Sequence, residues 1–391
     1  MPGIKDRVAI VGMGCTKFGE HWEKDVNDLM VEACWEAFED AGVGPQDIQA
    51  AWLGTTSSGR RGSMLTYPLK LGYIPVTRVE NACATGTDAM RNACYSVAAG
   101  IYDLVLVCGV EKLKDSGYSG LPLNPEVVTS GVEAPVPAPV QFALAATRYF
   151  HHYNLKYEDG KRVLAKIAVK NHHNGTMNPK AHFQREITVE QAVNAPMVAW
   201  PLGLFDCCGV SDGSAAAVIT RADLAPRFRK DYVLVKGLGL ACGAAQAQLQ
   251  SSYDFVHFEE TVQAGKAAYQ EAGVTNPREQ VSMAVVHDCF TITELLIYED
   301  LAFSPRGKGP EDVEAGTFEL KGKLPVNTDG GLKCFGHPIG ASGIRMIYEM
   351  YKQLQGKAGA RQLPNPQIGL THNLGGRPGW FTCAVGIFGR G

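Results

Sequence analysis

The sequence lacks the features of a nucleic-acid-binding or membrane protein. Its formal net charge is −3 over 391 residues, and no tract of lysine and arginine stands out. Without such a cluster the chain has no patch that would hold a nucleic acid or an anionic membrane surface. No apolar run approaches the roughly 18 residues that a membrane-spanning helix requires. We therefore expect neither nucleic acid nor membrane among its partners.

The sequence also has little that points to secretion, metal binding or dinucleotide binding. Residues 1–7 have no apolar signal-peptide core and the last residues carry no peroxisomal signal, so we expect a cytoplasmic protein. The eleven cysteines form no CxxC pair and no zinc-finger spacing with histidine, which predicts reduced thiols and no metal site. Gly12-Met13-Gly14 begins like a dinucleotide-binding loop, but Lys17 stands where that loop needs its third glycine.

The sequence does contain a regular alternation of apolar strands and amphipathic helices. It is 45% hydrophobic and 20% charged, as a globular protein with a large core should be. Strands that alternate with helices predict an α/β fold around a parallel or mixed sheet. We expect strands at residues 8–11, 50–54, 104–110, 233–240, 283–286, 368–372 and 381–387, and helices at 29–41, 88–99, 259–272, 292–303 and 344–354.

The order of these elements divides the chain into three parts. Residues 1–114 form a first α/β half in this prediction. Residues 115–231 form an inserted, proline-rich lobe of loops and short helices, with a strand that returns to the first half. The lobe is expected to contain a loop rich in histidine and asparagine at residues 171–178. Residues 232–391 form a second half that repeats the plan of the first.

One segment of the first half has the properties of a nucleophilic site. Residues 79–86, VENACATG, predict a strand that turns sharply into a helix, with Cys83 at the joint. A thiol at a helix N-terminus meets unpaired N–H groups and the positive end of the helix dipole, which predicts a lowered pKa and a reactive thiolate. A buried structural cysteine is the commoner alternative, and it stays open at this point.

Three polar segments of the second half fall at strand ends, where open α/β sheets place their sites. They are His287-Asp288-Cys289-Phe290, Gly336-His337-Pro338 and His372-Asn373-Leu374-Gly375-Gly376. A nucleophilic cysteine needs a base, usually histidine, and the carbonyl under attack needs two donors at its oxygen. A single histidine at a strand end is more often only a hydrogen-bonding residue. Together with Cys83, however, these segments make four polar spots at matching places in two halves, which indicates one active site.

In their order along the chain, these motifs resemble those of the thiolases. Cys83 stands where that family has its nucleophile, and Gly336-His337-Pro338 matches the GHP motif. His287-Asp288-Cys289-Phe290 matches the HDCF motif of the sterol-carrier-protein-x, or lipid-transfer-protein, type. The resemblance runs nearly end to end. It implies the thiolase fold, in which duplicated α/β halves form a five-layer αβαβα sandwich with an inserted loop lobe.

The resemblance implies an acyltransferase that cleaves a 3-oxoacyl-CoA with CoA or, in the reverse direction, performs the Claisen condensation. Cys83 would carry the acyl group and His337 would take its proton. His287 and His337 would hold the enolate oxygen, and the backbone N–H groups of Cys83 and Gly375 would form the second oxyanion hole. Coenzyme A would be a substrate, with no tightly bound cofactor.

One departure from most thiolases concerns the second catalytic cysteine. Where they carry a CxG motif, this chain has Asn373-Leu374-Gly375. In HDCF-type enzymes the cysteine of that motif is the substitute, which implies Cys289 as the acid/base thiol. The thiolase acting on benzoylsuccinyl-CoA also lacks the CxG cysteine, so an aromatic or branched substrate of that kind is one expectation.

Contacts with CoA and with other proteins are expected from the same resemblance. Ser342, Gly243 and Asn373 are weak candidates for CoA contacts, and Arg227 and Arg229 for its nucleotide phosphates. We expect a homodimer formed through the sheet edge near residues 78–81. A small partner protein with a zinc ribbon and an OB fold is also expected, and would hold the only zinc.

Three other functions stay open on the sequence alone. A decarboxylating, ketoacyl-synthase-like condensing enzyme also uses one cysteine and two histidines, but needs no second thiol such as Cys289. A retro-aldolase of the same fold forms no acyl-enzyme, and the presence of Cys83 argues against it. A non-catalytic scaffold that binds acyl-CoA for a partner would have no need of an intact nucleophile and base.

Overall fold

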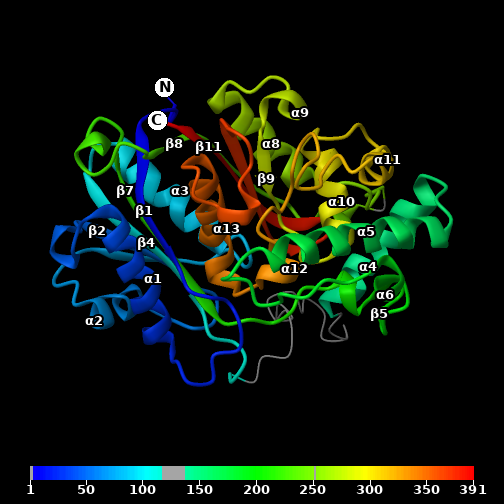
Figure 1. Ribbon diagram of the computed structural model, residues 1–391, viewed down its shortest axis with the longest axis horizontal. Helices are drawn as coiled ribbons and strands as arrows, with labels where there is room; N and C mark the ends of the chain where they lie inside the picture. The colour runs from blue at the N-terminus through cyan, green and yellow to red at the C-terminus, as the bar shows by residue number, and fades with distance from the viewer. Residues whose placement is uncertain (1–2, 117–136, 251) are drawn as a thin grey trace.

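The computed structural model describes residues 3–116, 137–250 and 252–391. Over these ranges the chain forms a mixed nine-stranded sheet (Figure 1). Helices cover the outer faces of the sheet and also lie between its two parts. The strand order is β3-β2-β4-β7-β1-β8-β11-β10-β9. Within the described ranges no helix has the length and apolarity to cross a membrane. Residues 117–136 of the predicted lobe lie outside the described residues.

The strands and helices agree closely with the expected positions. The strands are β1 (Val8–Cys15), β2 (Ala50–Gly54), β3 (Val76–Val79), β4 (Leu104–Glu111), β5 (Met197–Ala199), β6 (Leu202–Gly203), β7 (Gly213–Arg221), β8 (Val233–Cys242), β9 (Met283–Val285), β10 (Ile368–Arg377) and β11 (Trp380–Arg390). The longer helices are α1 (Val26–Ala41), α3 (Thr85–Ala98), α4 (Ala138–His152), α5 (Tyr157–Thr176), α8 (Glu259–Ala272), α10 (Thr291–Asp300) and α13 (Ile339–Leu354). The shorter helices are α2 (Thr66–Leu69), α6 (Val189–Val193), α7 (Gln246–Leu249), α9 (Pro277–Gln280), α11 (Gly309–Glu314) and α12 (Gly331–Phe335).

Both parts of the sheet follow one strand plan. In the first part β2 lies between the parallel strands β3 and β4, and β7 separates β4 from β1. In the second part β9, β10, β11 and β8 take the places of β2, β4, β7 and β1. Val326 forms a single parallel bridge to β9 where the first part has β3. The sheet therefore shows the expected repeat, while the limits at residues 114 and 231 stay a prediction.

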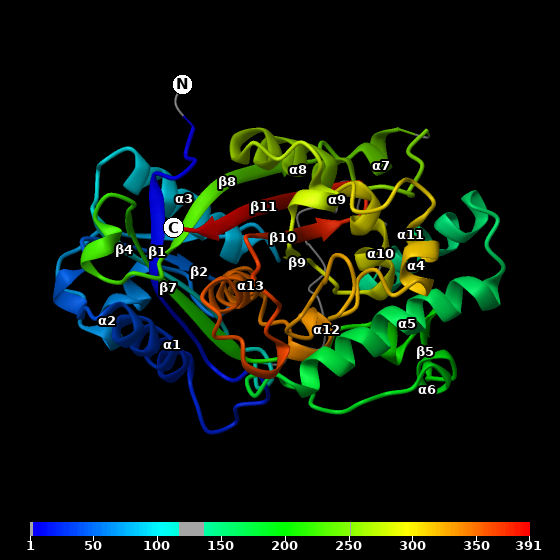
Figure 2. The same cartoon turned by 45° about the horizontal axis from the view of Figure 1, so that its top comes forward.

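The helices form layers around these strands. Helix α1 packs on β1, β4 and β7, and α8 packs on β8 and β11. Helices α3 and α13 pack on each other and contact strands of both parts, so they form the central layer (Figures 1 and 2). This arrangement is the expected five-layer αβαβα sandwich. Strands β1 and β8 also pair over a short stretch, which joins the two sheets at one edge.

The lobe is more helical than expected. The predicted loop at residues 171–178 is wrong, because α5 continues to Thr176. Most of the polar residues that suggested a loop, Asn171, His172, Asn174 and Asn178, are instead buried inside the protein, and His173 faces solvent. Asn171 Nδ2 donates to the carboxylates of Asp288 and Glu294, at 2.8 and 2.7 Å, and Asn174 Nδ2 donates to Asn327 O at 3.0 Å. The polarity of this segment therefore reflects a buried network.

The two central helices approach each other at glycines near their N-termini. A Cβ on Gly86 of α3 would lie 2.8 Å from Gly340 O and 3.0 Å from Gly343 N of α13, closer than a side chain tolerates. Glycine here therefore lets the two helix N-termini meet. Cys83 lies just before α3, and His337 lies just before α13. The duplicated fold thus brings the two predicted catalytic residues to the same place.

Candidate active site

The turn that carries Cys83 is held in an unusual backbone conformation. Ala82 has a φ of 48°, in the left-handed region that a residue with a Cβ seldom adopts. Thr85 Oγ1 accepts the N–H of Asn81 at 2.8 Å and donates to Ala82 O at 2.5 Å, which fixes both sides of the turn. Strain of this kind persists where the surroundings enforce it, and it collects at functional sites. The predicted strand-turn-helix around Cys83 is confirmed.

Cys83, His287 and His337 come together in one buried cluster. One ligand-type atom of each residue, the sulfur or a ring nitrogen, lies within 4.8 Å of the others. The two imidazole rings are perpendicular, with centroids 5.3 Å apart. All three side chains are nearly enclosed, at 6%, 2% and 3% exposure. Residues separated by some 250 positions along the chain therefore share one site.

Hydrogen bonds assign the tautomer of His337. Ser342 Oγ donates to Pro338 O at 2.9 Å, so that hydroxyl can only accept from the imidazole. His337 Nδ1 lies 2.7 Å from Ser342 Oγ and therefore carries the proton. The other ring nitrogen, Nε2, is buried and has no partner among the described residues. Its lone pair is free, which is the state required of a general base.

The tautomer of His287 is the opposite one. Thr87 Oγ1 lies 3.2 Å from Asn373 Oδ1, and this contact turns the amide nitrogen of Asn373 toward His287 Nδ1 at 3.3 Å. An amide nitrogen can only donate, so His287 Nδ1 accepts and Nε2 carries the proton. His287 is thus a hydrogen-bond donor, and His337 is an acceptor.

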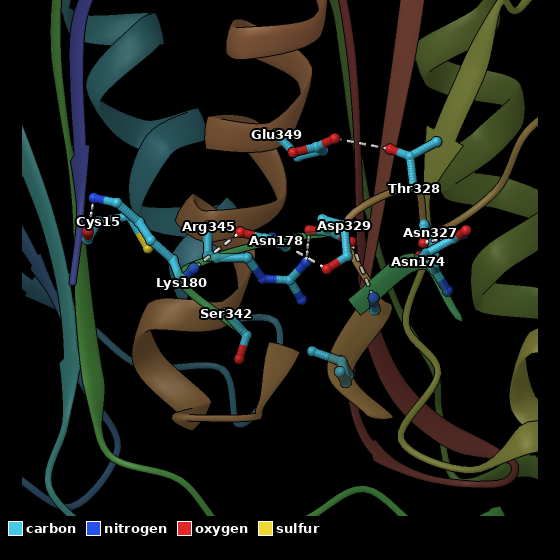
Figure 3. Close-up of polar contacts among 12 residues, drawn as sticks. Cys15, Asn174, Asn178, Lys180, Asn327, Thr328, Asp329, Ser342, Arg345 and Glu349 are labelled. Carbon is cyan, nitrogen blue, oxygen red and sulfur yellow. Dashed lines mark hydrogen bonds and ion pairs between the residues drawn. The ribbon is translucent and has the colours of Figure 1, made fainter. Parts of the chain in front are cut away.

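Burial keeps both imidazoles neutral. Burial, together with the nearby guanidinium of Arg345, lowers the pKa of His337 to about 3. Burial also holds the pKa of His287 well below its usual range, helped by the positive charge that His337 would carry. Arg345 projects from α13 toward Asp329, with which it forms a fully buried ion pair (Figure 3). At neutral pH the site therefore holds a neutral base and a neutral donor.

The predicted lowering of the Cys83 pKa is wrong. Burial raises the pKa of this thiol, a thiolate at Cys208 would raise it further, and so do the negative charges of Glu111 and Glu80. The contribution of its own backbone N–H has the expected sign but is smaller than the cost of desolvating a thiolate. The resting state is consequently a thiol beside a neutral imidazole, and the thiolate forms when His337 takes the proton.

In the described ranges, Cys83, His287 and His337 are also the one group of side chains with the spacing of a metal site. Their ligand-type atoms all lie within 4.8 Å of one another, and the ligand atoms of tetrahedral zinc lie about 3.3–3.7 Å apart. A zinc ion would also need a lone pair on His287 Nε2, which carries a proton. The expectation that the chain holds no metal of its own stays a prediction.

Cys289 is two residues after His287 and is not among the three residues of the cluster. It follows β9 and precedes α10, and its sulfur is 3.6 Å from Thr293 Oγ1. Burial holds the pKa of Cys289 well above its usual range, and a thiolate at Cys208 or Cys83 would raise it further. That Cys83 and Cys289 act on the same substrate stays a prediction.

Gly375 packs directly against the nucleophile. A Cβ at this position would lie 2.4 Å from Asn81 O, 2.7 Å from Cys83 N and 2.8 Å from Ala84 N, all of them backbone atoms. The backbone of β10 at Gly375 therefore packs against the backbone of the Cys83 turn with no room for a side chain between them. This contact is consistent with an oxyanion hole built from the N–H groups of Cys83 and Gly375.

The candidates for CoA contacts have other roles or other places. Ser342 and Asn373 hydrogen-bond to the two histidines, so they position the site. Gly243 packs against the carboxylate of Glu260, and its contact with CoA stays a prediction. Arg227 and Arg229 follow the end of β7, and Arg229 is paired with Asp40 and Asp231. Their contact with the phosphates of CoA stays a prediction.

Sequence reasoning missed two buried carboxylates that hold the site together. Glu111 accepts the N–H groups of Thr56, Ser57 and Ser58 at 2.8–3.0 Å, and also that of Gly340 at 2.9 Å in the first turn of α13. Asp288 accepts the N–H groups of Leu332 and Lys333 at 2.6 and 3.2 Å, in the helix before His337. Glu111 could have been found from the sequence, because an acidic residue directly follows the apolar strand at 104–110.

Comparison with known proteins agrees with the fold and the site. Residues 8–223 match the family model "Thiolase, N-terminal domain", and residues 241–388 match "Thiolase C-terminal domain-like". An acetyl-CoA acetyltransferase of Methanothermobacter thermautotrophicus is 39% identical over 98% of this chain and 99% of its own length. The benzoylsuccinyl-CoA thiolase subunit BbsB of Thauera aromatica is 32% identical over 95% of this chain and 96% of its own.

The solved structures include one close match over the whole chain. It is described as an Ltp2-ChsH2(DUF35) aldolase, with a TM-score of 0.84 and 26% identity over 99% of this chain and 98% of that one. The family models, the relatives of equal length and this match together cover every element described above. The chain belongs to the thiolase family.

Proposed function

We propose that this protein is a thiolase that transfers an acyl group between Cys83 and CoA. The observation that carries the proposal is one buried cluster in which a thiol meets two neutral imidazoles of opposite tautomer. Such a set supplies a nucleophile, its base and a donor for a developing oxyanion. The relatives named acetyl-CoA acetyltransferase and benzoylsuccinyl-CoA thiolase subunit support acyl transfer on CoA esters. Among the possible substrates we include aromatic and branched 3-oxoacyl-CoA.

The first half-reaction forms the acyl-enzyme. His337 Nε2 takes the proton of Cys83 as the sulfur attacks the 3-keto carbon of the substrate. The oxyanion of the tetrahedral intermediate lies against the N–H groups of Cys83 and Gly375. Each donor of this kind contributes about 3–4 kcal/mol of barrier lowering in mutational precedents.

The carbon–carbon bond then breaks and leaves a thioester enolate. His287 Nε2–H donates to the enolate oxygen, and the protonated His337 is a second donor there. Cys289 gives its proton to the enolate carbon and releases the shorter acyl-CoA. The Cys289 thiolate takes the proton of an incoming CoA, the CoA thiolate attacks acyl-Cys83, and His337 returns its proton to the Cys83 sulfur as the acyl group leaves. The raised pKa of Cys289 suits it to hold a proton until the enolate forms.

Two variants separate these steps. Cys83→Ser is expected to abolish the acyl-enzyme that intact-mass spectrometry detects after incubation with a 3-oxoacyl-CoA. Cys289→Ala is expected to accept an acyl group on Cys83 from a simple acyl-CoA, but to lose cleavage of the 3-oxoacyl-CoA. Full turnover by Cys289→Ala would remove that thiol from the mechanism, and a Cys83→Ser enzyme that still cleaves the substrate would refute the acyl-enzyme.

A retro-aldolase is the second candidate, because one close structural match is described as an aldolase. An aldolase would release its product without a covalent intermediate, so Cys83→Ser would keep much of its activity. A condensing enzyme would release CO₂ from a malonyl thioester, and a scaffold would bind acyl-CoA without turnover. A panel of 3-oxoacyl-CoA, 3-hydroxyacyl-CoA and malonyl-CoA substrates distinguishes all four functions.

Partners and location are part of the same proposal. We infer a homodimer through the exposed edge strand β3, since Thr77 in the middle of this strand faces solvent. Thr77→Asp would set like charges against each other, and light scattering would then detect a monomer. The subunit name of one relative and the ChsH2(DUF35) partner of one structural match support a small partner protein, for which we keep the zinc-ribbon and OB-fold expectation. Eleven free cysteines support a reducing, cytoplasmic location.

A further inference from the structure

A third thiol, Cys208, lies beside the two predicted catalytic cysteines. Its N–H donates to Cys289 O at 2.9 Å, and Cys207 forms an antiparallel bridge with Phe290. Two residues further on, Val210 packs against the small apolar cluster that contains Cys83. Cys208 therefore lies in a segment, residues 207–210, that contacts Cys289 and Phe290 at one end and the apolar cluster of Cys83 at the other.

The three thiols differ in their access to solvent. Cys289 is 1% exposed and Cys83 is 6% exposed, whereas Cys208 is only partly buried. The antiparallel bridge of Cys207 with Phe290 sets Cys208 opposite Cys289, and opposed residues of an antiparallel pair project to the same side. Cys208 is therefore a neighbour of Cys289 and the more exposed of the two thiols.

A buried ammonium lies next to Cys208. Lys333 is 2% exposed, and its Nζ donates to Cys207 O at 2.7 Å. None of the ion pairs in the described ranges includes Lys333, so its charge is free to act on the thiols. Burial raises the pKa of Cys208 to about 12, and Lys333 opposes this rise, while Cys207 and Asp288 add to it. A cation in this position stabilises a thiolate formed at Cys208.

We propose that Cys208 relays protons between Cys289 and the thiol of the incoming CoA. The proposal rests on the thiolase function given above. When Cys289 has protonated the enolate carbon, it is left as a thiolate that solvent barely reaches. Cys208 passes its own proton to Cys289 and becomes a thiolate beside Lys333. The CoA thiol then protonates Cys208, and the CoA thiolate attacks acyl-Cys83.

The relay balances over one turnover. The proton of the CoA thiol ends on the enolate carbon, the carbon–carbon bond is replaced by a carbon–hydrogen bond and a thioester, and all three enzyme thiols return to their starting state. No oxidant, reductant or metal takes part. Cys208 and Lys333 act on the carbon–carbon step and on CoA entry, and they take no part in the acylation of Cys83.

The test compares Cys208→Ala and Cys208→Ser with the wild-type enzyme in two assays. The first measures acylation of Cys83 by intact mass, with the acyl-CoA that the wild-type enzyme prefers. The second measures steady-state thiolysis of the corresponding 3-oxoacyl-CoA between pH 6 and 10. Both variants should acylate within about twofold of wild type and lose about 10²-fold or more in thiolysis kcat, the low end of general acid–base effects. Cys207→Ala, whose sulfur contacts Gly203 O on the other side, is the matched control and should keep the wild-type kcat.

Variants of Lys333 provide a second test, because a residue with a merely structural role would not change the pH profile of thiolysis. Lys333→Met should shift the pH profile of thiolysis kcat upward by about one unit, and Lys333→Arg should restore it. The relay is overturned if both Cys208 variants keep the wild-type kcat and pH profile, or if acylation and thiolysis fall together. If the wild-type enzyme itself forms no acyl-Cys83, then the thiolase function fails, and this outcome is distinct from a failure of the relay.

Discussion

Gly375→Ala tests the contact between β10 and the nucleophile turn. The added methyl group would lie 2.4 Å from Asn81 O and 2.7 Å from Cys83 N, and neither backbone atom can rotate away. Ordinary contacts of a Cβ begin near 3.4 Å, so the two chains must separate by about 1 Å. A displacement of that size at a reacting group costs about 10²-fold in rate, and loss of one oxyanion donor costs about 10²–10³-fold. We expect kcat for thiolysis to fall by about 10²–10³-fold, with a much smaller change in KM.

The same substitution should cost only modest stability. Overpacking of this kind costs about 1–3 kcal/mol, which urea unfolding measures. Gly369→Ala, six residues earlier in the same strand, is the control. Its methyl group would press on Met350 Sδ at 2.4 Å and Met283 Cε at 3.0 Å, both at the ends of flexible side chains away from Cys83. Gly369→Ala should therefore keep kcat while losing similar stability. If Gly375→Ala keeps the wild-type kcat, then this backbone contact does not form the oxyanion hole.

Three further substitutions test the positioning network and the buried charges. Burial lowers the pKa of His372 to about 3, so the unfolded chain binds that proton first as the pH falls below about 6.5, and stability is lost from there down to pH 3. His372→Gln should reduce the loss of unfolding free energy between pH 7 and pH 5 by about 2 kcal/mol in urea titrations, and equal losses in both proteins would contradict this. Ser342→Ala removes the acceptor of His337 Nδ1–H. Rapid-quench mass measurements should show acylation of Cys83 slowed about tenfold, which corresponds to the loss of one hydrogen bond. An unchanged rate would mean that another group sets the tautomer of His337. Glu111→Gln puts an amide where Thr56 N and Gly340 N now donate to a carboxylate. Calorimetry should show that the free energy of unfolding falls by about 3 kcal/mol. An unchanged free energy would mean that water takes over the hydrogen bonds of the carboxylate.

Much of the scaffold could be predicted because its elements carry strong local signals. Helix α1 ends at Gly42, whose φ of 70° is left-handed, and the apolar run at residues 104–110 is a strand buried on both faces. The loop expected at 171–178 was wrong, because asparagine and histidine side chains on a helix face can be buried against partners from elsewhere in the chain. Local composition cannot distinguish that burial from exposure to solvent.

The sequence by itself determined which residues could do chemistry here. Cys83, His287, Cys289 and His337 stand at strand and helix ends that their neighbours specify, and each is recognisable from a few adjacent residues. Only the tertiary structure decided how they behave. It made the Cys83 pKa rise instead of fall, since desolvation outweighs the helix terminus, and it gave the two imidazoles opposite tautomers through Ser342 and Asn373. Charge and proton position depend on what surrounds an atom, and those surroundings come from parts of the chain that no local pattern connects.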